Sequence, residues 1–361
     1  MRLLLAGGGT GGHLFPAVAL AQTLRHHNPQ SRVQFVGTER GLESRLLPRL
    51  GLPLATIDMV GFVGRGLRGK IQTVPRLIKS VGQSLAIVRS FRPDLVVGVG
   101  GYASVPVLLA ARMTGIPCVL HEQNAIPGLS NKLLARMAKT VCVSFPASEK
   151  YFGRASVVVT GNPLREGMAD VSAAVPENGI LLIFGGSRGA RAINQAVVAM
   201  LPELISANKG LRILHQSGDD DLDMVRRGYE EAGLDPDQVV PFIDDMAAAY
   251  EQAKLVICRA GATTIAELTA CGRPAILIPY PFAAGDHQTA NGAAVVNAGA
   301  GQLLSQKELT ASKLAALTTS LLADQARLQQ MGEHGRTLGR TDAAQRILEE
   351  CERLVPQRED D

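Results

Sequence analysis

The sequence predicts an α/β protein built from two doubly wound, Rossmann-like domains that face a cleft. Short apolar runs ending in glycine alternate with longer amphipathic segments, a pattern typical of parallel strands that are buried on both faces and joined by helices. The length of 361 residues exceeds one ordinary core. The two halves also begin alike, with LLLAGGGTGGH near the start and LLIFGGSRGAR at residues 181–191.

The expected elements follow from these apolar runs. Predicted strands of the first half are RLLLAG, RVQFVG, LVVGVG, PCVLHE, VCVSF and SVVVTGN. Those of the second half are GILLIFGG, LRILHQSG, VVPFI, KLVICRAG and PAILIPY. Helices are expected over Phe15–His26, Glu43–Leu50, Pro75–Arg89, Val105–Met113, Leu129–Met137, Ala190–Leu204, Met246–Gln252, Thr263–Cys271 and Gln288–Asn297.

A polar segment without periodicity, GNPLREG (161–167), predicts the domain boundary. We therefore expect an N-terminal domain over 1–162, a C-terminal domain over 163–340 and a C-terminal helix over 341–361. In this last segment one amphipathic face carries Ile347, Leu348, Cys351 and Leu354. The helix is expected to pack back toward the N-terminal domain.

Composition restricts the class of protein. Apolar residues make up 46% and charged residues 19% of the chain, as in a globular protein with substantial cores. The N-terminus lacks the pattern of a signal peptide, and no apolar run approaches the ~20 residues that span a bilayer. Five scattered cysteines predict buried thiols in a reducing cytoplasm, with neither disulfides nor a zinc site.

The net charge of +4 conceals two opposite halves. Residues 1–165 carry 20 Lys and Arg against 6 Asp and Glu, whereas residues 166–361 carry 17 against 27. A basic half is expected to face a polyanion, which leaves nucleic acid, phospholipid and a phosphorylated substrate open. Uneven surface charge without function is the alternative.

The first glycine-rich loop is typical of an anion site. Gly7, Gly9 and Gly12 have the spacing of a dinucleotide fingerprint between a strand and a helix, so a nicotinamide or flavin enzyme is one hypothesis. Its acidic partner is only approximated by Glu39, and the loop holds more glycines than the motif needs. The sequence thus predicts backbone amides at a helix N-terminus that can bind an anion, without specifying which anion. Residues 185–190 form a second glycine-rich loop with the same chemistry.

Three polar segments add candidate ligand contacts. Glu267, in CRAGATTIAELTACGRPAILIPYP (258–281), is suited either to a ribose diol or to stabilising its own helix. HEQNAIPG (121–128) puts four polar side chains at the carboxyl end of a strand, where open α/β sheets bind ligands. Tyr102 and Ser104 follow another strand. The pair Asp286 and His287, in GDHQTANG, lacks a third ligand and predicts no metal.

An amphipathic helix is expected within residues 67–94. Its apolar stripe is Leu77, Ile78, Val81, Leu85 and Val88. Basic residues flank the stripe: Arg68, Lys70, Arg76, Lys79, Arg89 and Arg92. Packing on the sheet explains most of the stripe, while contact with an anionic membrane surface is the alternative.

The motifs together resemble a known family. GGGTGGH, GGYAS, HEQN, GNPLR, GGSRGA, FIDDMAAAY, RAGATTIAEL and DHQTANG occur in this order along nearly the whole chain, and they closely resemble the MurG family of bacterial cell-wall glycosyltransferases. The resemblance implies the GT-B fold and an inverting transfer, without metal or cofactor, of GlcNAc from UDP-GlcNAc. The implied acceptor is lipid I, undecaprenyl-pyrophosphoryl-MurNAc-pentapeptide, at the C4 hydroxyl of MurNAc. It also implies a peripheral enzyme on the cytoplasmic face of the plasma membrane that binds anionic lipid and no nucleic acid.

The resemblance also implies site residues. Contacts to the sugar nucleotide are expected from Thr10, Gly11, Gly12, Asn124, Arg165, Ser187, Ile243, Ala262, Thr263, Thr264, Ile265, Ala266, Glu267 and Gln288. The acceptor side comprises the first glycine loop, Tyr102, HEQN and the apolar-basic patch near residues 70–90. His13 is the first candidate for the general base because histidine ordinarily titrates near neutrality, and Glu122 and His121 are rivals. Another GT-B sugar-nucleotide enzyme, either a glycolipid transferase or a non-hydrolysing epimerase, is the alternative.

Overall fold

The computed structural model describes residues 1–59 and 67–355, and side chains are described from residue 75 onward within the second range. Arg68 and Lys70, predicted on the basic rim, therefore lie outside the described side chains. The chain forms two compact units. Unit 1 comprises residues 1–165 and the C-terminal segment from residue 342, and unit 2 comprises residues 166–341.

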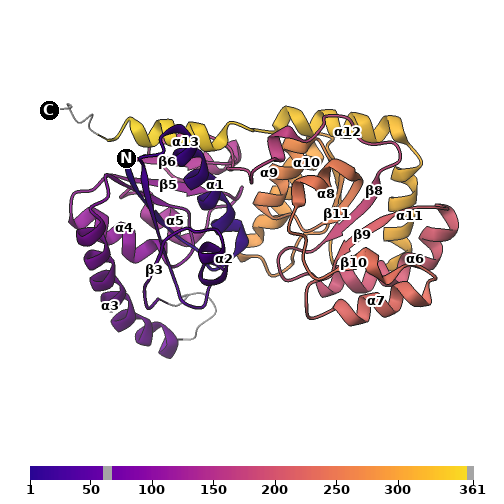
Figure 1. Ribbon diagram of the computed structural model, residues 1–361, viewed down its shortest axis with the longest axis horizontal. Helices are drawn as coiled ribbons and strands as arrows, with labels where there is room; N and C mark the ends of the chain where they lie inside the picture. Colours follow the sequence, from indigo (N-terminus) through magenta and orange to yellow (C-terminus); the bar gives the residue numbers. More distant parts are fainter. Residues whose placement is uncertain (60–66, 356–361) are drawn as a thin grey trace. The chain divides into compact units, whose positions relative to one another are not determined.

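Unit 1 contains a seven-stranded parallel sheet in the order β3-β2-β1-β4-β5-β6-β7 (Figure 1). Leu5 in the central strand pairs with Phe35 on one side and with Val97 on the other. The strand order therefore reverses between β1 and β4. The strands are β1 (Arg2–Ala6), β2 (Arg32–Gly37), β3 (Leu54–Thr56), β4 (Leu95–Gly98), β5 (Cys118–Glu122), β6 (Thr140–Val143) and β7 (Val157–Val159).

Helices cover both faces of this sheet. Successive side chains of a strand point to opposite faces, so Leu3 and Leu5 pack in one core, while Leu4 and Ala6 pack in another. The first core includes α1 and α13, and the second includes α3, α4 and α5 (Figure 1). The helices are α1 (Gly11–His27), α2 (Glu43–Arg49), α3 (Leu67–Phe91), α4 (Ser104–Met113), α5 (Leu129–Leu134) and α13 (Ala343–Glu352), with the 3₁₀ helix η1 (Pro146–Tyr151).

The C-terminal helix α13 belongs to unit 1. It packs against α1. Its residues Ile347, Leu348 and Cys351 are buried in the same core as Leu3 and Leu5. Burial in the apolar core also raises the pKa of the Cys351 thiol well above its ordinary value, which keeps this thiol protonated and unreactive.

Unit 2 contains a six-stranded parallel sheet in the order β10-β9-β8-β11-β12-β13. Its strands are β8 (Ile180–Phe184), β9 (Ile213–Gln216), β10 (Val239–Val240), β11 (Ala253–Cys258), β12 (Ala275–Leu277) and β13 (Gly301–Leu303). Its α-helices are α6 (Arg191–Ala207), α7 (Leu222–Glu231), α8 (Met246–Gln252), α9 (Ala262–Cys271), α10 (His287–Asn297), α11 (Ala311–Leu322) and α12 (Gln325–Leu338). Short 3₁₀ helices are η2 (Met168–Asp170), η3 (Pro236–Gln238) and η4 (Ala284–Asp286).

The predicted fold class, two doubly wound parallel α/β sheets, is confirmed. Each predicted apolar run contains a strand, and the strand pairs are parallel. The predicted helix over Phe15–His26 begins too late, because α1 begins at Gly11, whereas α3 (Leu67–Phe91) lies within the range 67–94 expected for an amphipathic helix. The short strands β3 and β13 and the helices α7, α11 and α12 were not predicted.

Buried neutral histidines are expected to make the folded protein less stable at acidic pH, and one of them lies in a polar cluster of unit 2. The Tyr229 hydroxyl donates to His215 Nδ1, and His215 Nε2 donates to Asn194 Oδ1, each over 3.1 Å. Burial lowers the pKa of His215 to about 3, and that of His121 in unit 1 to about 4. Both rings are therefore neutral in the folded protein, whereas an unfolded histidine takes up a proton near pH 6.5.

We expect the free energy of unfolding to fall as the pH drops from about 6.5 toward 4, because the unfolded state binds more protons in this window. Each of the two histidines contributes a slope of about 1.4 kcal/mol per pH unit. Denaturant titrations across this range should show a shallower slope for His215→Gln than for the wild type. The exposed His27 provides the control: His27→Gln should keep the wild-type slope. Equal slopes for His215→Gln and the wild type would contradict this account.

Candidate functional site

Both sheets place predicted site residues where the strand order reverses. In unit 1 the loops after β1 and β4 hold Thr10 and Tyr102, and in unit 2 the loops after β8 and β11 hold Ser187 and the start of α9. Because all strands of a sheet are parallel, their carboxyl ends share one edge. Open α/β sheets bind ligands at this edge, beside the reversal point. Each unit thus has one candidate site.

The first glycine loop is built around Glu43, a buried carboxylate at the start of α2. Glu43 Oε2 accepts from Gly9 N over 2.8 Å, and Oε1 accepts from Thr38 N over 2.9 Å and from Thr38 Oγ1 over 3.1 Å. A Cβ at Gly8 would lie 2.5 Å from the Glu43 carboxyl carbon, and a Cβ at Gly41 would overlap the same group. Several glycines therefore admit a carboxylate of the protein itself, and one loop amide already donates to it.

The first turn of α1 lies beyond this carboxylate. Thr10 is the N-cap residue, makes no capping hydrogen bond through its side chain, and precedes a first turn without acidic residues. A Cβ at Gly11 would lie 2.9 Å from the Phe15 ring, and the Arg165 guanidinium carbon lies 4.8 Å from the centre of that ring. Among the described residues, Thr10 Oγ1 lies 3.9 Å from a Cβ built at Gly12. The helix N-terminus and Arg165 therefore offer positive charge at this turn.

His13 joins the glycine loop to the HEQN segment. Its Nδ1 lies 3.1 Å from Gln123 Oε1, and its ring packs against Gly100. Gln123 Nε2 lies 2.8 Å from Val99 O and 3.2 Å from His121 Nδ1. His121 is 1% exposed, and burial is the main cause of its lowered pKa. The structure thus brings together the predicted base His13 and its rival His121 through Gln123.

Glu122, the other rival, holds the HEQN loop together. Its Oε1 accepts from Asn124 N over 2.9 Å and from Asn124 Nδ2 over 3.2 Å. Its Oε2 accepts from Gly128 N over 3.1 Å and from Asn131 Nδ2 over 2.9 Å. The side chain is buried, so both oxygens are engaged in local structure. Asn124, a predicted sugar-nucleotide contact, is fixed by the same bonds.

In unit 2 the second glycine loop packs tightly on its neighbour. A Cβ at Gly189 would overlap Ser217 O, and one at Gly218 would overlap Arg188 O, so these glycines permit backbone contact between the loops after β8 and β9. Gly186, with φ of +102°, has no atom of the described residues within 4 Å of a Cβ built on it. Ser187 beside it is exposed. The part of this loop that is open to a ligand is therefore Gly186 and Ser187.

The predicted nucleotide residues of unit 2 surround the start of α9. Ala262 and Thr263 begin this helix, Thr264 and Ala266 are half-buried, and Ile265 is buried. Glu267 is 1% exposed, and Tyr250 Oη donates to its Oε2 over 3.2 Å. A half-buried Ile243 follows β10.

Gln288 lies at the start of α10. Its Oε1 accepts from Tyr280 N over 2.9 Å, which directs the amide from the first turn of α10 toward the loop after β12. His287 Nδ1 donates to Ala284 O over 2.9 Å and so caps the local turn. Within residues 1–59 and 67–355 no group of three His, Cys, Asp or Glu side chains is arranged to hold a metal ion.

Two residues that support the site, Glu43 and Tyr250, were not predicted as site residues. Gln123 was predicted within the HEQN motif, but its hydrogen bond to His13 was not, because the two residues are 110 positions apart. Glu43 was predicted only as the first residue of a helix. Tyr250 was predicted only within a helix, so only the fold reveals its contact with Glu267.

Two parallel Rossmann-like units, each with glycine-rich loops at the reversal point of its sheet, define a protein of the GT-B fold. Residues 3–143 match the N-terminal domain of glycosyltransferase family 28, and residues 180–347 match the C-terminal domain of this family. The chain belongs to glycosyltransferase family 28.

Relatives cover the whole chain. A UDP-N-acetylglucosamine–N-acetylmuramyl-(pentapeptide) pyrophosphoryl-undecaprenol N-acetylglucosamine transferase of Syntrophotalea carbinolica is 57% identical over 99% of this chain and 100% of its own length. The transferase of the same name from Geotalea uraniireducens is 48% identical over 98% of both chains. The crystal structure of Acinetobacter baumannii MurG is 33% identical, covers 98% of this chain and 99% of its own, and has a TM-score of 0.79.

Proposed function

We propose that this enzyme transfers GlcNAc from UDP-GlcNAc to the C4 hydroxyl of MurNAc in undecaprenyl-pyrophosphoryl-MurNAc-pentapeptide, with inversion at the anomeric carbon. The observation that carries the proposal is the 57% identity, over 99% of the chain, to a transferase named for this donor and acceptor. The position of His13 at the mouth of the glycine loop supports it, because the reaction needs a base for the acceptor hydroxyl.

The donor is assigned to unit 2. Ile243 contacts the uracil and Glu267 accepts from the ribose hydroxyls, with Tyr250 holding its second oxygen. The diphosphate binds at Ser187 and the amides at the start of α9. The positive end of the helix dipole there stabilises the charge on departing UDP. Gln288 binds the sugar through its amide.

The acceptor is assigned to unit 1, beside the glycine loop, Tyr102 and HEQN. His13 takes the proton of the C4 hydroxyl as this oxygen attacks the anomeric carbon. The bond from that carbon to the UDP oxygen breaks on the opposite face, and UDP leaves with the electron pair. His13 is preferred over its rivals because both oxygens of Glu122 already accept hydrogen bonds and His121 is fully enclosed.

Transfer of labelled GlcNAc to a lipid I analogue tests the proposal. We expect product only when both substrates are present, and the same rate after treatment with EDTA. Release of UDP or epimerised sugar without the acceptor would instead indicate a non-hydrolysing epimerase. Product with an unrelated glycolipid but not with lipid I would assign another acceptor, and loss of activity on chelation would overturn the metal-independent mechanism.

Membrane contact is assigned to the helical surface of unit 1. Among the described residues of unit 1, the large apolar side chains that are more than 60% exposed are Ile78 of α3, Met113 of α4, and Leu129 and Leu133 of α5. In this unit α3 packs on α4 and α4 on α5. Exposed basic residues lie on α3 and α4 and just after α5: Arg76, Lys79, Arg89, Arg112 and Arg136. Apolar side chains within a basic surface suit anionic phospholipid.

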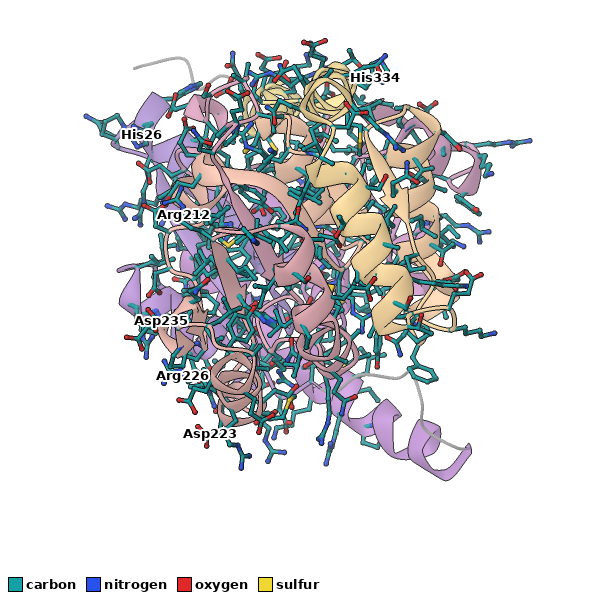
Figure 2. All side chains as sticks on the ribbon, turned by 90° about the vertical axis from the view of Figure 1, so that its right-hand side faces the viewer. His26, Arg212, Asp223, Arg226, Asp235 and His334 are labelled. Atoms are coloured by element: carbon teal, nitrogen blue, oxygen red, sulfur yellow. The ribbon has the colours of Figure 1, made fainter. Side chains whose placement is uncertain are left out.

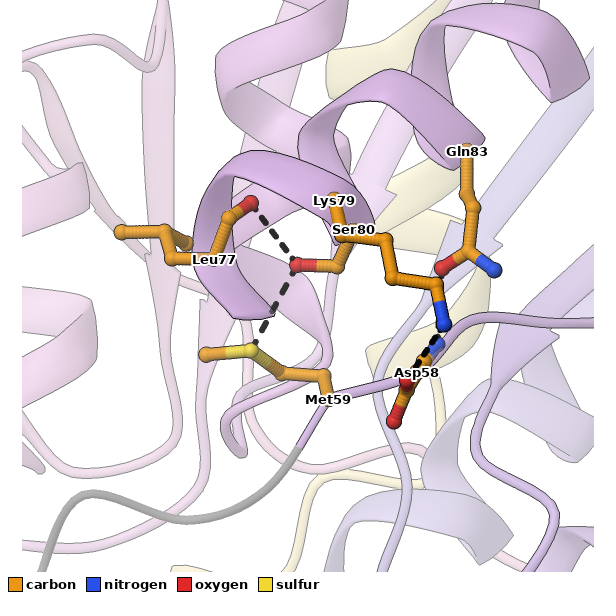
Figure 3. Close-up of polar contacts among 6 residues, drawn as sticks. All are labelled: Asp58, Met59, Leu77, Lys79, Ser80 and Gln83. Atoms are coloured by element: carbon orange, nitrogen blue, oxygen red, sulfur yellow. Dashed lines mark hydrogen bonds and ion pairs between the residues drawn. The ribbon is translucent and has the colours of Figure 1, made fainter. Parts of the chain in front are cut away.

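Contacts between the middle of α3 and residues 58–59 hold the exposed face of α3 in place (Figure 3). Lys79 Nζ lies 2.8 Å from Asp58 Oδ2, Asp58 N donates to Gln83 Oε1 over 2.8 Å, and Ser80 Oγ contacts Met59 Sδ. The hydrogen bond and charge of Lys79 lower the pKa of Asp58. These contacts fix the rotation of α3, so that Ile78 stays outward while Val88 is buried. No helix within the described residues is long and apolar enough to cross a bilayer.

Replacing two outward apolar residues should weaken membrane binding. For Ile78→Ser with Leu133→Ser we expect the affinity for vesicles containing anionic lipid to fall about tenfold or more, because each buried aliphatic side chain contributes about 1.5–3 kcal/mol. Sedimentation with vesicles measures this, and binding should weaken further with added salt. Leu338→Ser, at an exposed position in unit 2, is the control. Unchanged vesicle binding of the double variant would show that this surface does not contact the membrane.

A further inference from the structure

A chain of buried hydrogen bonds in unit 1 determines which nitrogen of His13 carries its hydrogen. The chain runs from Gly161 through His121 and Gln123 to His13. Gln123 and His121 are each 1% exposed, so water does not compete for their polar atoms. The direction of every bond then follows from which atoms can only accept.

Gln123 is oriented by a backbone carbonyl. One atom of its amide lies 2.8 Å from Val99 O, which only accepts, so this atom is the donating Nε2. The other atom is Oε1, which also only accepts, and it lies 3.1 Å from His13 Nδ1. His13 Nδ1 must therefore carry the hydrogen, and Nε2 of the neutral ring is left unprotonated.

The hydrogen bonds of His121 are consistent with this orientation of the Gln123 amide. Its Nε2 lies 3.1 Å from Gly161 O and must donate, so its Nδ1 accepts the second hydrogen of Gln123 Nε2 over 3.2 Å. Burial lowers the pKa of His121 to about 4, which keeps the ring neutral near pH 7. A protonated Nδ1 would face the N–H of Gln123 and break the chain.

The ring of His13 is also held in place. A Cβ at Gly100 would lie 3.0 Å from both Cε1 and Nδ1 of His13, so the edge bearing Nδ1 is packed against the loop after β4. Turning the ring over would replace Nδ1 by carbon at Gln123 Oε1 and lose that hydrogen bond. Packing and hydrogen bonding therefore select the same ring orientation.

We infer that Gln123 is a positioning residue that holds His13 in the tautomer with hydrogen on Nδ1, so that Nε2 is the atom that accepts the proton of the acceptor hydroxyl. The inference rests on the proposed transfer, in which His13 is the base. In the opposite tautomer Nε2 already carries a hydrogen and has no electron pair to offer. After proton transfer the ring is a cation, and Nδ1 still donates to Gln123.

Nitrogen NMR of the full chain labelled with ¹⁵N-histidine tests the inference. The spectrum of the wild type should show His13 with a protonated Nδ1 and an unprotonated Nε2, with His13→Gln identifying its signals among the seven histidines. Gln123→Met keeps the length of the side chain but removes the amide. We expect its His13 signals to move toward a mixture of tautomers, and kcat to fall about 10- to 100-fold with KM for UDP-GlcNAc unchanged.

The matched control is Gln216→Met. Gln216 is a buried glutamine of unit 2 whose Nε2 donates to Pro241 O over 3.1 Å, so its replacement loses a similar bond without touching His13. The His13 signals should stay unchanged in this variant.

Two results would overturn the inference: hydrogen on Nε2 of His13 in the wild type, or an unchanged tautomer in Gln123→Met. The spectrum of the wild type decides the first even where the variant does not fold. A changed tautomer with unchanged kcat would have a different meaning. Gln123 would then position His13, as inferred, while His13 would not be the base, and the proposed mechanism would fail alone.

Discussion

Replacing His13 by alanine is expected to lower kcat by about 10²- to 10⁴-fold, the contribution typical of a general base. KM for UDP-GlcNAc should stay near its wild-type value, because the proposed contacts to the uracil, ribose and sugar, at Ile243, Glu267 and Gln288, lie on unit 2, whereas His13 lies on α1 of unit 1. Steady-state kinetics with a lipid I analogue measure both constants. A loss confined to kcat identifies an interaction made in the transition state.

Two further measurements separate a lost base from a damaged loop. Added imidazole should restore part of the turnover of His13→Ala, because the small base can enter the vacated space, but it should not stimulate the wild type. His26, on the same helix, points away from the ribbon into solvent (Figure 2), and His26→Ala should retain full activity. Near-full turnover of His13→Ala with an unchanged pH profile would transfer the base role to another residue.

The sheets were predictable because their strands are continuous apolar runs. Buried parallel strands need such runs on both faces. LLLA alternates between two cores as expected, and all five residues of ILLIF are buried. Two of the helices that were not predicted, α7 and α12, contain glycines, which lower the helix propensity of these segments. A Cβ at Gly228 would overlap Val198, and one at Gly332 would lie 2.5 Å from Gly272 O. These glycines permit close packing, yet in the sequence they indicate a break.

Helix α11 carries ordinary helix signals in its sequence. Thr310 caps its first turn by accepting from Lys313 N, and Leu314 and Leu321 are buried. An N-cap threonine followed by apolar residues with helical spacing is sufficient to predict such a helix. The short strands β3 and β13 have three residues each and offer no comparable pattern.

The loops that form the site were predictable from the sequence, but the hydrogen bonds between them were not. Motifs located the glycine loops and HEQN because parallel strands bring their carboxyl ends to one edge. They did not reveal which polar atoms meet, since the bonds from His13 to Gln123 and from Gly9 to Glu43 join residues 110 and 34 positions apart. The spacing of the first glycines also matched a dinucleotide motif, although Gly8 makes room for Glu43 and Gly9 N donates to it.

Replacing Glu43 is therefore expected to destabilise unit 1 and loosen the glycine loop. Glu43→Ala leaves Gly9 N and both donors of Thr38 without their acceptor and opens a cavity beside Gly8 and Gly41. We expect a loss of about 3 kcal/mol or more in the free energy of unfolding. Glu43→Gln keeps the shape but turns an N–H toward one of these donors, for an expected loss of about 1–3 kcal/mol.

Amide exchange separates local from global effects in these variants. Denaturant titration gives the free energy of unfolding, and hydrogen exchange at Gly9 and Thr38 gives local opening, which we expect to accelerate about tenfold or more in Glu43→Gln. Glu39→Gln, at an exposed position four residues earlier, should change stability by less than about 0.5 kcal/mol. If the Gly9 amide stays equally protected in Glu43→Gln, the carboxylate does not organise the loop. In that case Gly8 would only make room for Glu43, and other contacts would order the loop.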